Sequence, residues 1–221
     1  MHARFIKNFR GRKILTEKEV KDLLKDYEIP TTNYRLVSYE EDLRELNLEY
    51  PLVLKVCSPR YTHKTEVGGV RLNIKSRAEL FTAFKEFKKK FTNERFLVES
   101  MEEPGLELII GAVEDYTFGH AIMLGLGGVY TELFKDVTFR VVPINSKDAE
   151  EMIMEIKASE FVKGFRGMKI STKALINILL KTSELIVDYQ DHIKELDLNP
   201  VLVREKDAVV VDARMVLRRR S

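Results

Sequence analysis

The stretch from Pro51 to Ile74 constrains the fold more than any other part of the chain, because it places a lysine inside an apolar run. The run extends from Leu52 to Val56 and contains Lys55, and a second run from Val70 to Ile74 alternates apolar and polar residues. Both runs have the length and residue types of β-strands. An unpaired buried charge is costly, so the lysine needs an anion such as a phosphate close to it. The sequence therefore predicts two strands joined by a loop, with an anionic partner for Lys55.

The loop between these strands ends in two glycines, Gly68 and Gly69. Paired glycines allow a backbone to approach an anion closely, or to make a turn that other residues cannot. With Lys55 as a point charge, they form a candidate phosphate-binding loop. The alternative is that Lys55 extends its stem out of the strand to solvent, and spacing alone leaves both interpretations open.

The same loop carries His63, which is a further candidate for chemistry. A histidine can act as a nucleophile toward a phosphoryl group and form a phosphohistidine. An isolated loop histidine is more commonly an ordinary solvated residue. His63 is singled out because it lies beside the candidate phosphate site, whereas His2, His120 and His192 are interpreted as ordinary residues, as is Cys57.

The length and charge of the chain limit the classes of protein to consider. A chain of 221 residues suffices for one large domain or two small lobes. Its net charge of +2 gives no general reason to expect a nucleic-acid partner. It has no apolar run of membrane-spanning length and no apolar signal core, so we expect a cytoplasmic protein that does not insert into a membrane. A single glutamine among many Lys and Glu residues favours a thermophilic source.

Periodicity predicts helices and strands mixed along the whole chain. The predicted helices are Thr16–Glu28, Glu40–Leu48, one that starts at Ser76 and packs through Phe87, Ala149–Ile156 and Thr172–Tyr189. The predicted strands are Tyr34–Ser38, Leu52–Val56, Val70–Ile74, Phe96–Val98, Leu106–Val113, His120–Gly125, Tyr130–Phe134, Thr138–Pro143, Glu195–Val203 and Ala208–Val216. A second half of the chain is expected to begin near Arg95.

Three oxygen-bearing residues near the end of the chain form a candidate metal site. Asp197 and Asn199 are two apart on a predicted strand and so face the same side. A hairpin partner strand can place Asp212 opposite them. Carboxylate and amide oxygens suit Mg²⁺, which keeps waters and phosphates as its other ligands. The alternative is a capped turn, since these residue types and Pro200 are common in turns. Glu99 and Glu107 are further acids in strand-like runs that can join this site or hold a ribose; the alternative is that each is an ordinary acid of an edge strand.

Several segments of the chain, in order and spacing, resemble the β subunits of ADP-forming acetyl-CoA synthetases, a family with the ATP-grasp fold. More distantly, the chain resembles the β subunits of succinyl-CoA synthetases through its LNP and DA pattern. The resemblance extends from Thr16 to Leu217. The segments that carry it are PLVLKVCSPRYTHKTEVGGVRLNI, FLVESM, LELIIGAVEDYTFGHAIMLGLGGVYTELFKDVTFRVVPI, KGFRG, KELDLNPVLV and VVVDARMVL.

This resemblance implies an α+β protein whose two ATP-grasp lobes hold a nucleotide between them. The implied organisation is a flexible basic arm at 1–13, an N-terminal lobe at 14–94 with a mobile histidine loop, a C-terminal lobe at 95–217 with the metal site, and a basic tail at 218–221. Within it, Lys55 would contact nucleotide phosphates. The segment Glu99, Ser100 and Met101 would form the interlobe hinge that reads adenine.

The resemblance also implies roles for the remaining candidates. Glu107 would face the nucleotide, and Asn199 and Asp212 would hold Mg²⁺. His63 would receive a phosphoryl group from a phosphohistidine on a partner α subunit and pass it to ADP, with Asp197 supporting the phosphorylated histidine. The loop sequence at 60–62, Arg-Tyr-Thr, departs from the acid and two aliphatic residues common there in the family, a difference that concerns the packing and dynamics of the loop and not its chemistry.

The implied function is the nucleotide-binding subunit of an acetate–CoA ligase (ADP-forming), acting with a CoA-binding α subunit in an α2β2 heterotetramer. ATP or ADP is its substrate and Mg²⁺ its cofactor. Three alternatives remain open: another ATP-grasp carboxylate ligase that does not need His63, a non-catalytic nucleotide-binding or scaffold subunit, and nucleic-acid binding by the basic termini. The sequence does not determine the acyl group, the choice between ATP and GTP, the oligomeric state of the isolated chain, or the direction of the reaction in the cell.

Overall fold

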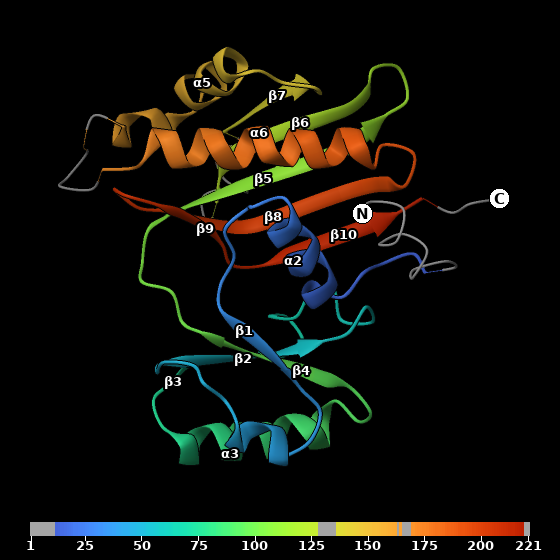
Figure 1. Ribbon diagram of the computed structural model, residues 1–221, viewed down its shortest axis with the longest axis vertical. Coiled ribbons are helices and arrows are strands. Elements are labelled where there is room, and N and C mark those ends of the chain that lie inside the picture. The colour runs from blue at the N-terminus through green and yellow to red at the C-terminus, as the bar shows by residue number, and fades with distance from the viewer. Residues whose placement is uncertain (1–11, 128–135, 163, 165–168, 219–221) are drawn as a thin grey trace. The chain divides into compact units, whose positions relative to one another are not determined.

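The computed structural model describes residues 12–127, 136–162, 164 and 169–218. They form two compact units, each with its own sheet and core (Figure 1). Unit 1 comprises the described residues up to Leu15, the segment Glu19–Thr31, and the described residues from Pro104 onward. Unit 2 comprises Thr16–Lys18 and Thr32–Glu103.

Unit 2 is built on a four-stranded antiparallel sheet whose strands lie in the order β1, β4, β2, β3. Their bounds are β1 Tyr34–Val37, β4 Arg95–Ser100, β2 Leu52–Cys57 and β3 Val70–Ile74. The helix α3, Arg77–Lys90, follows β3 directly. The prediction of two strands joined by the His63 loop is confirmed, since β2 and β3 pair along their length.

The start and the buried face of α3 follow from its sequence. The hydroxyl of Ser76 accepts a hydrogen bond from the Glu79 amide, which caps a helix end whose first amides have no helical partner. Leu80, Phe84 and Phe87 recur at helical spacing and are buried against the sheet. Phe84 and Phe87 meet Phe96 of β4 edge to face, with ring centroids 5.4 and 5.8 Å apart.

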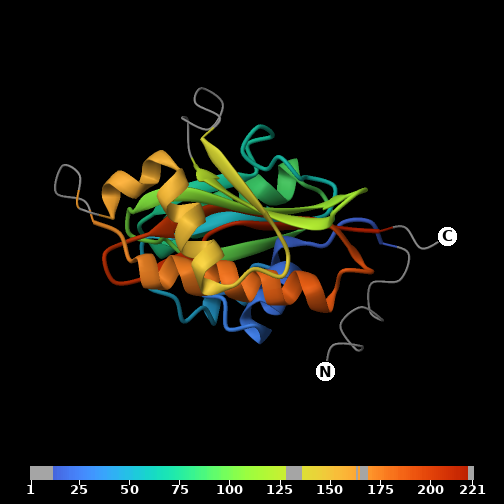
Figure 2. The ribbon, with the colours of Figure 1, turned by 90° about the horizontal axis from the view of Figure 1, so that it is seen from above.

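Unit 1 contains a six-stranded antiparallel sheet in the order β10, β8, β5, β6, β7, with β9 also paired to β8. Their bounds are β10 Ala213–Leu217, β8 Ile193–Val203, β5 Leu106–Asp115, β6 Gly119–Leu126, β7 Val137–Val141 and β9 Ala208–Val210. The helices α2 (Glu17–Asp26), α5 (Ser146–Glu155) and α6 (Thr172–Asp188) contribute to its core, and the short 3₁₀ helix η3 (Lys157–Phe161) follows α5. Figure 2 shows α6 lying along one face of this sheet.

Capping residues determine where the helices of unit 1 begin. Asn145 forms a capping box with Asp148 at the start of α5. Ser171 caps α6 by accepting a hydrogen bond from the Ala174 amide. In the part of the chain that the structure describes, no helix combines the length and the apolar composition needed to cross a lipid bilayer.

Two sequence predictions differ from the structure. Glu40–Leu48 is not an α-helix, and only a 3₁₀ helix, η1 (Glu41–Arg44), forms there. The Asp42 carboxylate accepts hydrogen bonds from the amides of Ser38 and Tyr39, which lie just before this turn. The predicted strand Ala208–Val216 is divided into β9 and β10, and the predicted strand Tyr130–Phe134 lies outside the described residues.

The chain also divides at a different point from the one predicted. The second half was expected to begin at Arg95, the first residue of β4. Because β4 pairs with both β1 and β2, it belongs to unit 2, and the division falls between Glu103 and Pro104. Conversely, Glu19–Thr31 belongs to unit 1 although it precedes the first strand of unit 2.

Candidate functional site

Lys55 lies in the middle of β2 with its ammonium group between two carboxylates. Its Nζ donates a hydrogen bond of 2.9 Å to Glu17 Oε1 and lies 3.0 Å from Glu99 Oε2. The side chains of all three residues are at most 5% exposed. The anions beside Lys55 are therefore carboxylates of the protein itself, where the sequence predicted an anion such as a phosphate, and its contact with nucleotide phosphates stays a prediction. The alternative, in which the lysine extends to solvent, is wrong.

The sheet register explains how these groups meet. Val53 is opposite Glu99 across β2 and β4, so Lys55 and Glu99 are diagonal neighbours on one face of the sheet. The other face of β2, with Leu54 and Val56, packs into the core under α3. Glu17 reaches Lys55 from the first turn of α2.

A second lysine joins this group from the histidine loop. Lys64 Nζ donates a hydrogen bond of 2.7 Å to Glu17 Oε2, and its side chain is only 11% exposed. Glu17 thus holds one lysine with each carboxylate oxygen. We call Lys55, Lys64, Glu17 and Glu99 the lysine–glutamate cluster. Its members satisfy the general requirement that buried charges be paired and hydrogen-bonded.

The two glycines of the loop close it onto the strands. Gly68 has a left-handed backbone with φ of 59°, and its amide donates to the Thr65 carbonyl. The Gly69 amide donates to the Lys64 carbonyl over 2.6 Å, and a Cβ at Gly69 would lie 2.6 Å from Val56 Cγ1. Both amides are therefore used within the loop in this conformation, and the role of Gly68 and Gly69 in phosphate binding stays a prediction.

His63 projects from this loop toward solvent. Its side chain is 66% exposed, and Nδ1 lies 3.6 Å from Oε1 of Glu66, which is itself exposed. The ring is accessible to a reacting group from outside the chain. The strands on either side of the loop, β2 and β3, pair with each other in the sheet.

Two residues that the sequence marks as ordinary have ordinary structural roles. Cys57 is buried at the end of β2, and burial raises the pKa of its thiol, which keeps it protonated and unreactive. His120 is buried in β6, and its Nε2 lies 2.8 Å from the Ile193 carbonyl, to which it donates. His192 is partly buried, and His2 lies outside the described residues.

The predicted hinge lies at the end of β4. The amide of Ser100 donates to the Asn33 carbonyl and that of Met101 donates to the Pro51 carbonyl, at 3.0 and 2.9 Å. The Met101 side chain is 38% exposed. These contacts fix the backbone on both sides of this point, and its role in reading a base stays a prediction.

The predicted metal residues Asn199 and Asp212 lie opposite each other in unit 1. The Asn199 amide donates to the Asp212 carbonyl over 3.0 Å, where β9 gives way to β10. In β8 the buried Leu196 and Leu198 face the core, so Asp197 and Asn199 share the other face of the sheet. The sequence prediction that Asp212 lies opposite this strand is confirmed.

Among these residues, Asp197 has a carboxyl group whose pKa is raised above its ordinary value. Burial raises the pKa of its carboxyl, while the nearby Arg214 guanidinium lowers it, and Glu195 and Asp212 raise it further. Across the sheet, Asp197 is paired with Gly111 of β5 and Arg214 of β10. The Met123 side chain packs over Gly111, where a Cβ would lie 3.3 Å from its Cε.

The donor set fits a magnesium ion. Asn199 and Asp212 offer an amide oxygen and a carboxylate, both hard ligands, and Mg²⁺ is commonly held by one or two such groups with waters and phosphates completing its shell. Within the described ranges no group of three or more His, Cys, Asp and Glu side chains is arranged to hold a metal by itself. A site in which the protein supplies only two ligands leaves the other positions around the ion to waters and to the phosphates of a nucleotide.

Glu107 lies on the same face of the sheet as Asp197. Its neighbours Leu106 and Leu108 in β5 are buried in the core, and Glu107 itself is exposed. Its carbonyl accepts a hydrogen bond of 2.8 Å from the Gly127 amide. A Cβ at Gly127 would lie 2.9 Å from that carbonyl oxygen, so the close approach requires glycine.

The predicted site residues therefore form two groups, one in each unit. The group in unit 2 contains Lys55, His63, Gly68, Gly69, Glu99, Ser100 and Met101, and the group in unit 1 contains Glu107, Asp197, Asn199 and Asp212. Sequence reasoning missed Glu17 and Lys64. The available signal was Lys55 itself, because a lysine inside an apolar strand requires carboxylates, but nothing in the sequence says which ones.

The chain is similar to known proteins along nearly its whole length. A family model described as an ATP-grasp domain matches residues 8–217. The chain is 43% identical to the acetate–CoA ligase [ADP-forming] II subunit beta of Pyrococcus furiosus over 95% of this chain and 94% of that one. It is 40% identical to the corresponding I subunit beta of the same organism, over 92% and 91% of the two chains.

Solved structures show the same similarity. A Pyrococcus horikoshii protein superposes with a TM-score of 0.91 at 41% identity, covering 99% of this chain and 98% of that one. The acetyl-coenzyme A synthetase 1 of Ca. Korarchaeum cryptofilum superposes with a TM-score of 0.84 at 42% identity, covering 98% and 97%. That enzyme was solved with coenzyme A and Mg-AMPPCP, with its phosphohistidine segment pointing towards the nucleotide-binding site.

Proposed function

Because the chain belongs to the ATP-grasp family, together with the β subunits of ADP-forming acetate–CoA ligases, we propose that it is the nucleotide-binding subunit of such a ligase. The observation that carries this proposal is the identity of 43% over nearly the full length of both chains. The enzyme converts acyl-CoA, ADP and phosphate into the free acid, CoA and ATP, reversibly. Its substrate on this subunit is ATP or ADP, and its cofactor is Mg²⁺.

His63 carries the phosphoryl group between the two subunits in this proposal. The P–N bond to a histidine of the α subunit breaks as a P–N bond to His63 forms, and the second bond then breaks as a terminal oxygen of ADP bonds to phosphorus. A carboxylate beside Nδ1 favours the proton on that nitrogen, which leaves the Nε2 lone pair as the nucleophile. The exposure of the ring supports this role, because a buried histidine could not meet a partner subunit.

The other candidates position and neutralise the nucleotide. Lys55 contacts its phosphates, beside the loop closed by Gly68 and Gly69, and Glu99 to Met101 read the base. Glu107 faces the nucleotide, and Asp197 supports the phosphorylated His63. Asn199 and Asp212 hold Mg²⁺, which neutralises charge on the phosphate oxygens when bound. Phosphoryl transfer depends chiefly on such positioning and charge neutralisation.

The organisation of the complete enzyme belongs to the same proposal. A CoA-binding α subunit supplies acyl transfer and the first phosphohistidine, in an α2β2 heterotetramer. The chain works in the cytoplasm of a thermophile. The many Lys and Glu residues and the single glutamine support the thermophilic source.

The test is phosphoryl transfer through His63. The chain is mixed with its α subunit and a labelled phosphoryl donor, and the label is followed to this chain and then to ADP. We expect label on the wild-type chain and on a Thr65→Ala control, and none on His63→Ala, which should fold normally because the ring is exposed.

Full turnover by His63→Ala would overturn the relay and favour an ATP-grasp ligase that forms an acyl phosphate directly. Nucleotide binding by the wild-type chain without any transfer, in the presence of the α subunit, would instead favour a non-catalytic subunit.

A further inference from the structure

The histidine loop is anchored at two points, one on each side of His63. On one side, the partly buried Tyr61 packs edge to face on Phe91, with ring centroids 5.0 Å apart. On the other side, Lys64 is held by the buried carboxylate of Glu17. The histidine between these anchors is itself exposed. The position of the loop is thus determined by its neighbours and not by His63.

We propose that Glu17 is a positioning residue for the phosphoryl relay: through Lys64 it docks the loop that carries His63 beside the nucleotide-binding Lys55. This inference deepens the proposed function and rests on it. Glu17 touches neither phosphate nor reacting nitrogen in this scheme. It acts by holding two lysines, one on the loop and one on β2.

The geometry makes this contact strong. The Glu17 side chain is 2% exposed, and the distances from its two oxygens to Lys55 Nζ and Lys64 Nζ are 2.9 and 2.7 Å. Hydrogen bonds between charged groups are about twice as strong as neutral ones, and low exposure protects them from water. Releasing the loop would leave the Glu17 carboxylate buried with one lysine fewer, which costs free energy.

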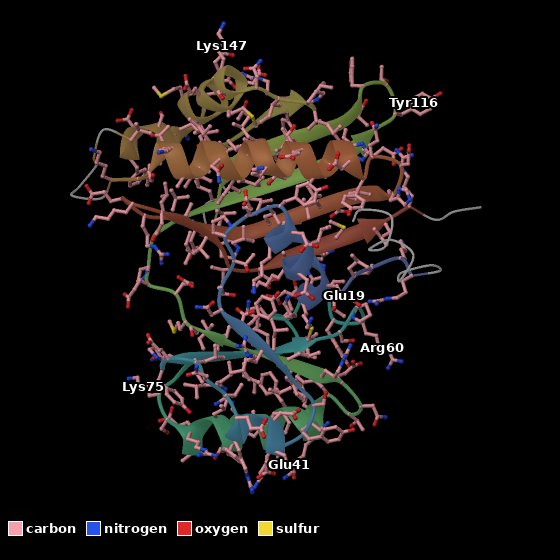
Figure 3. All side chains as sticks on the ribbon, viewed as in Figure 1. Glu19, Glu41, Arg60, Lys75, Tyr116 and Lys147 are labelled. Carbon is pink, nitrogen blue, oxygen red and sulfur yellow. The ribbon has the colours of Figure 1, made fainter. Side chains whose placement is uncertain are left out.

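A second ion pair on the same loop lacks these properties. Arg60 Nη1 lies 3.7 Å from Glu94 Oε1, and the Arg60 side chain is 79% exposed (Figure 3). Exposed pairs of this kind contribute little to stability. Arg60 is therefore the matched control for Lys64, since both are cations of one loop with a glutamate partner.

The docked loop lies beside the strand that binds nucleotide, so docking should favour delivery to ADP over reception from the α subunit. A loop that is merely structural would affect both half-reactions equally. The two half-reactions thus distinguish positioning from general stability.

The experiment uses Lys64→Met, which keeps the length of the side chain and leaves the Glu17–Lys55 pair in place, with Glu17→Gln as a second variant. The controls are Arg60→Met on the same loop and Glu19→Gln on the same helix, whose carboxylate pairs with Arg12 at 2.6 Å (Figure 3). Hydrogen exchange of residues 58–69 is measured in the full chain, and the two transfer steps are measured in the complex with the α subunit.

We expect Lys64→Met to raise the rate of hydrogen exchange in the loop by about tenfold or more. A tenfold change corresponds to the lower end of the free energy that is lost with a hydrogen bond between charged groups. The same variant should slow transfer from phospho-His63 to ADP by a similar factor, while reception from the α subunit and the affinity for ADP stay close to wild type. Both controls should match wild type.

Loop exchange in Lys64→Met no faster than in Arg60→Met would overturn the docking role, as would equal slowing of both half-reactions. Because the exchange measurement needs no phosphoryl transfer, it tests the docking of the loop by Glu17 separately. A wild-type chain that passes no label through His63 would overturn the proposed function, and with it the relay role of Glu17, but not the docking.

Discussion

Lys55 shows how a single residue can determine what surrounds it. Its side chain lies in β2 and is 5% exposed, and its ammonium group lies beside the carboxylates of Glu17 and Glu99. In the proposed function this lysine also contacts nucleotide phosphates. A phosphate must then compete with carboxylates that already bind the same cation, so Lys55 has a structural role and a binding role together.

We expect Lys55→Met to destabilise unit 2 by about 3–5 kcal/mol, because removing one partner of a buried ion pair leaves uncompensated charge at Glu17 and Glu99. Urea denaturation followed by a probe in unit 2 measures this. The control is Lys75→Met at an exposed position after β3, which should change stability by less than about 0.5 kcal/mol. Equal stability of the two variants would contradict the buried pairing.

The sequence allowed some of these residue contacts to be predicted. A lysine in an apolar run required an anion, and one is present at Lys55. The identity of the anion could not be predicted, because Glu17 is 38 residues away in the chain and looks like an ordinary acid in a helix's first turn. Likewise, Asn199 and Asp212 were predicted to be opposite each other, because a hairpin brings its two strands together locally.

Among the elements, those with strong periodicity were predicted well. The helices α3 and α6 were found from their apolar spacing, and β2 and β3 from their runs of strand-forming residues. The prediction of a helix at Glu40–Leu48 was wrong, since only the single 3₁₀ turn Glu41–Arg44 forms there. The division into β9 and β10 was missed, since the apolar pattern continues through Val211 and the register against β8 is the same on both sides of the break.

The contact between β7 and α5 gives a prediction for pH dependence. Glu155 at the end of α5 accepts hydrogen bonds from Arg140 and Thr138 of β7, and these bonds, the one from Arg140 first, lower the pKa of its carboxyl below the ordinary value of 4.5. The ionised carboxylate therefore stabilises the folded state. This contribution is fully present above about pH 4.5 and is lost as the pH falls through the lower folded-state pKa.

We expect Glu155→Gln to lower stability at pH 7 by about 0.2–1 kcal/mol, the range for exposed ion pairs, and the deficit to be smaller at pH 3, below the ordinary pKa of 4.5. Thermal denaturation at both values measures it. Glu151→Gln, whose carboxylate is 3.6 Å from the same arginine, should have a smaller effect. A deficit that is unchanged at pH 3 would show that the effect is not electrostatic.

At the scale of the whole molecule, the chain has two separately packed cores. The core of unit 1 includes Leu175 and the core of unit 2 includes Phe96, both fully buried. Two lobes were expected from the sequence, but the boundary was placed at Arg95. Strand β4, which begins at Arg95, joins the sheet of unit 2 because it pairs with β1 and β2, and both are distant from it in sequence. The residues of a strand do not by themselves determine which strands lie beside it.

A cavity in one core should therefore destabilise its own unit first. We expect Phe96→Ala to cost about 3–5 kcal/mol and Leu175→Ala about 2–5 kcal/mol. Hydrogen exchange should rise in β2 and β4 for the first variant and in β5 and β8 for the second, each leaving the other unit protected. Loss of protection in both units from either variant would mean that the cores unfold as one.

The low exposure of the lysine–glutamate cluster has a consequence for how the loop responds to its medium. Dissolved ions screen charges that face water, such as Arg71 and Glu86, whose side chains are 52% and 54% exposed, far more than charges that water does not reach. The Glu17–Lys64 contact belongs to the second kind. A cell that accumulates salt would weaken the surface pairs of this protein, while the attachment of its histidine loop would persist at high ionic strength.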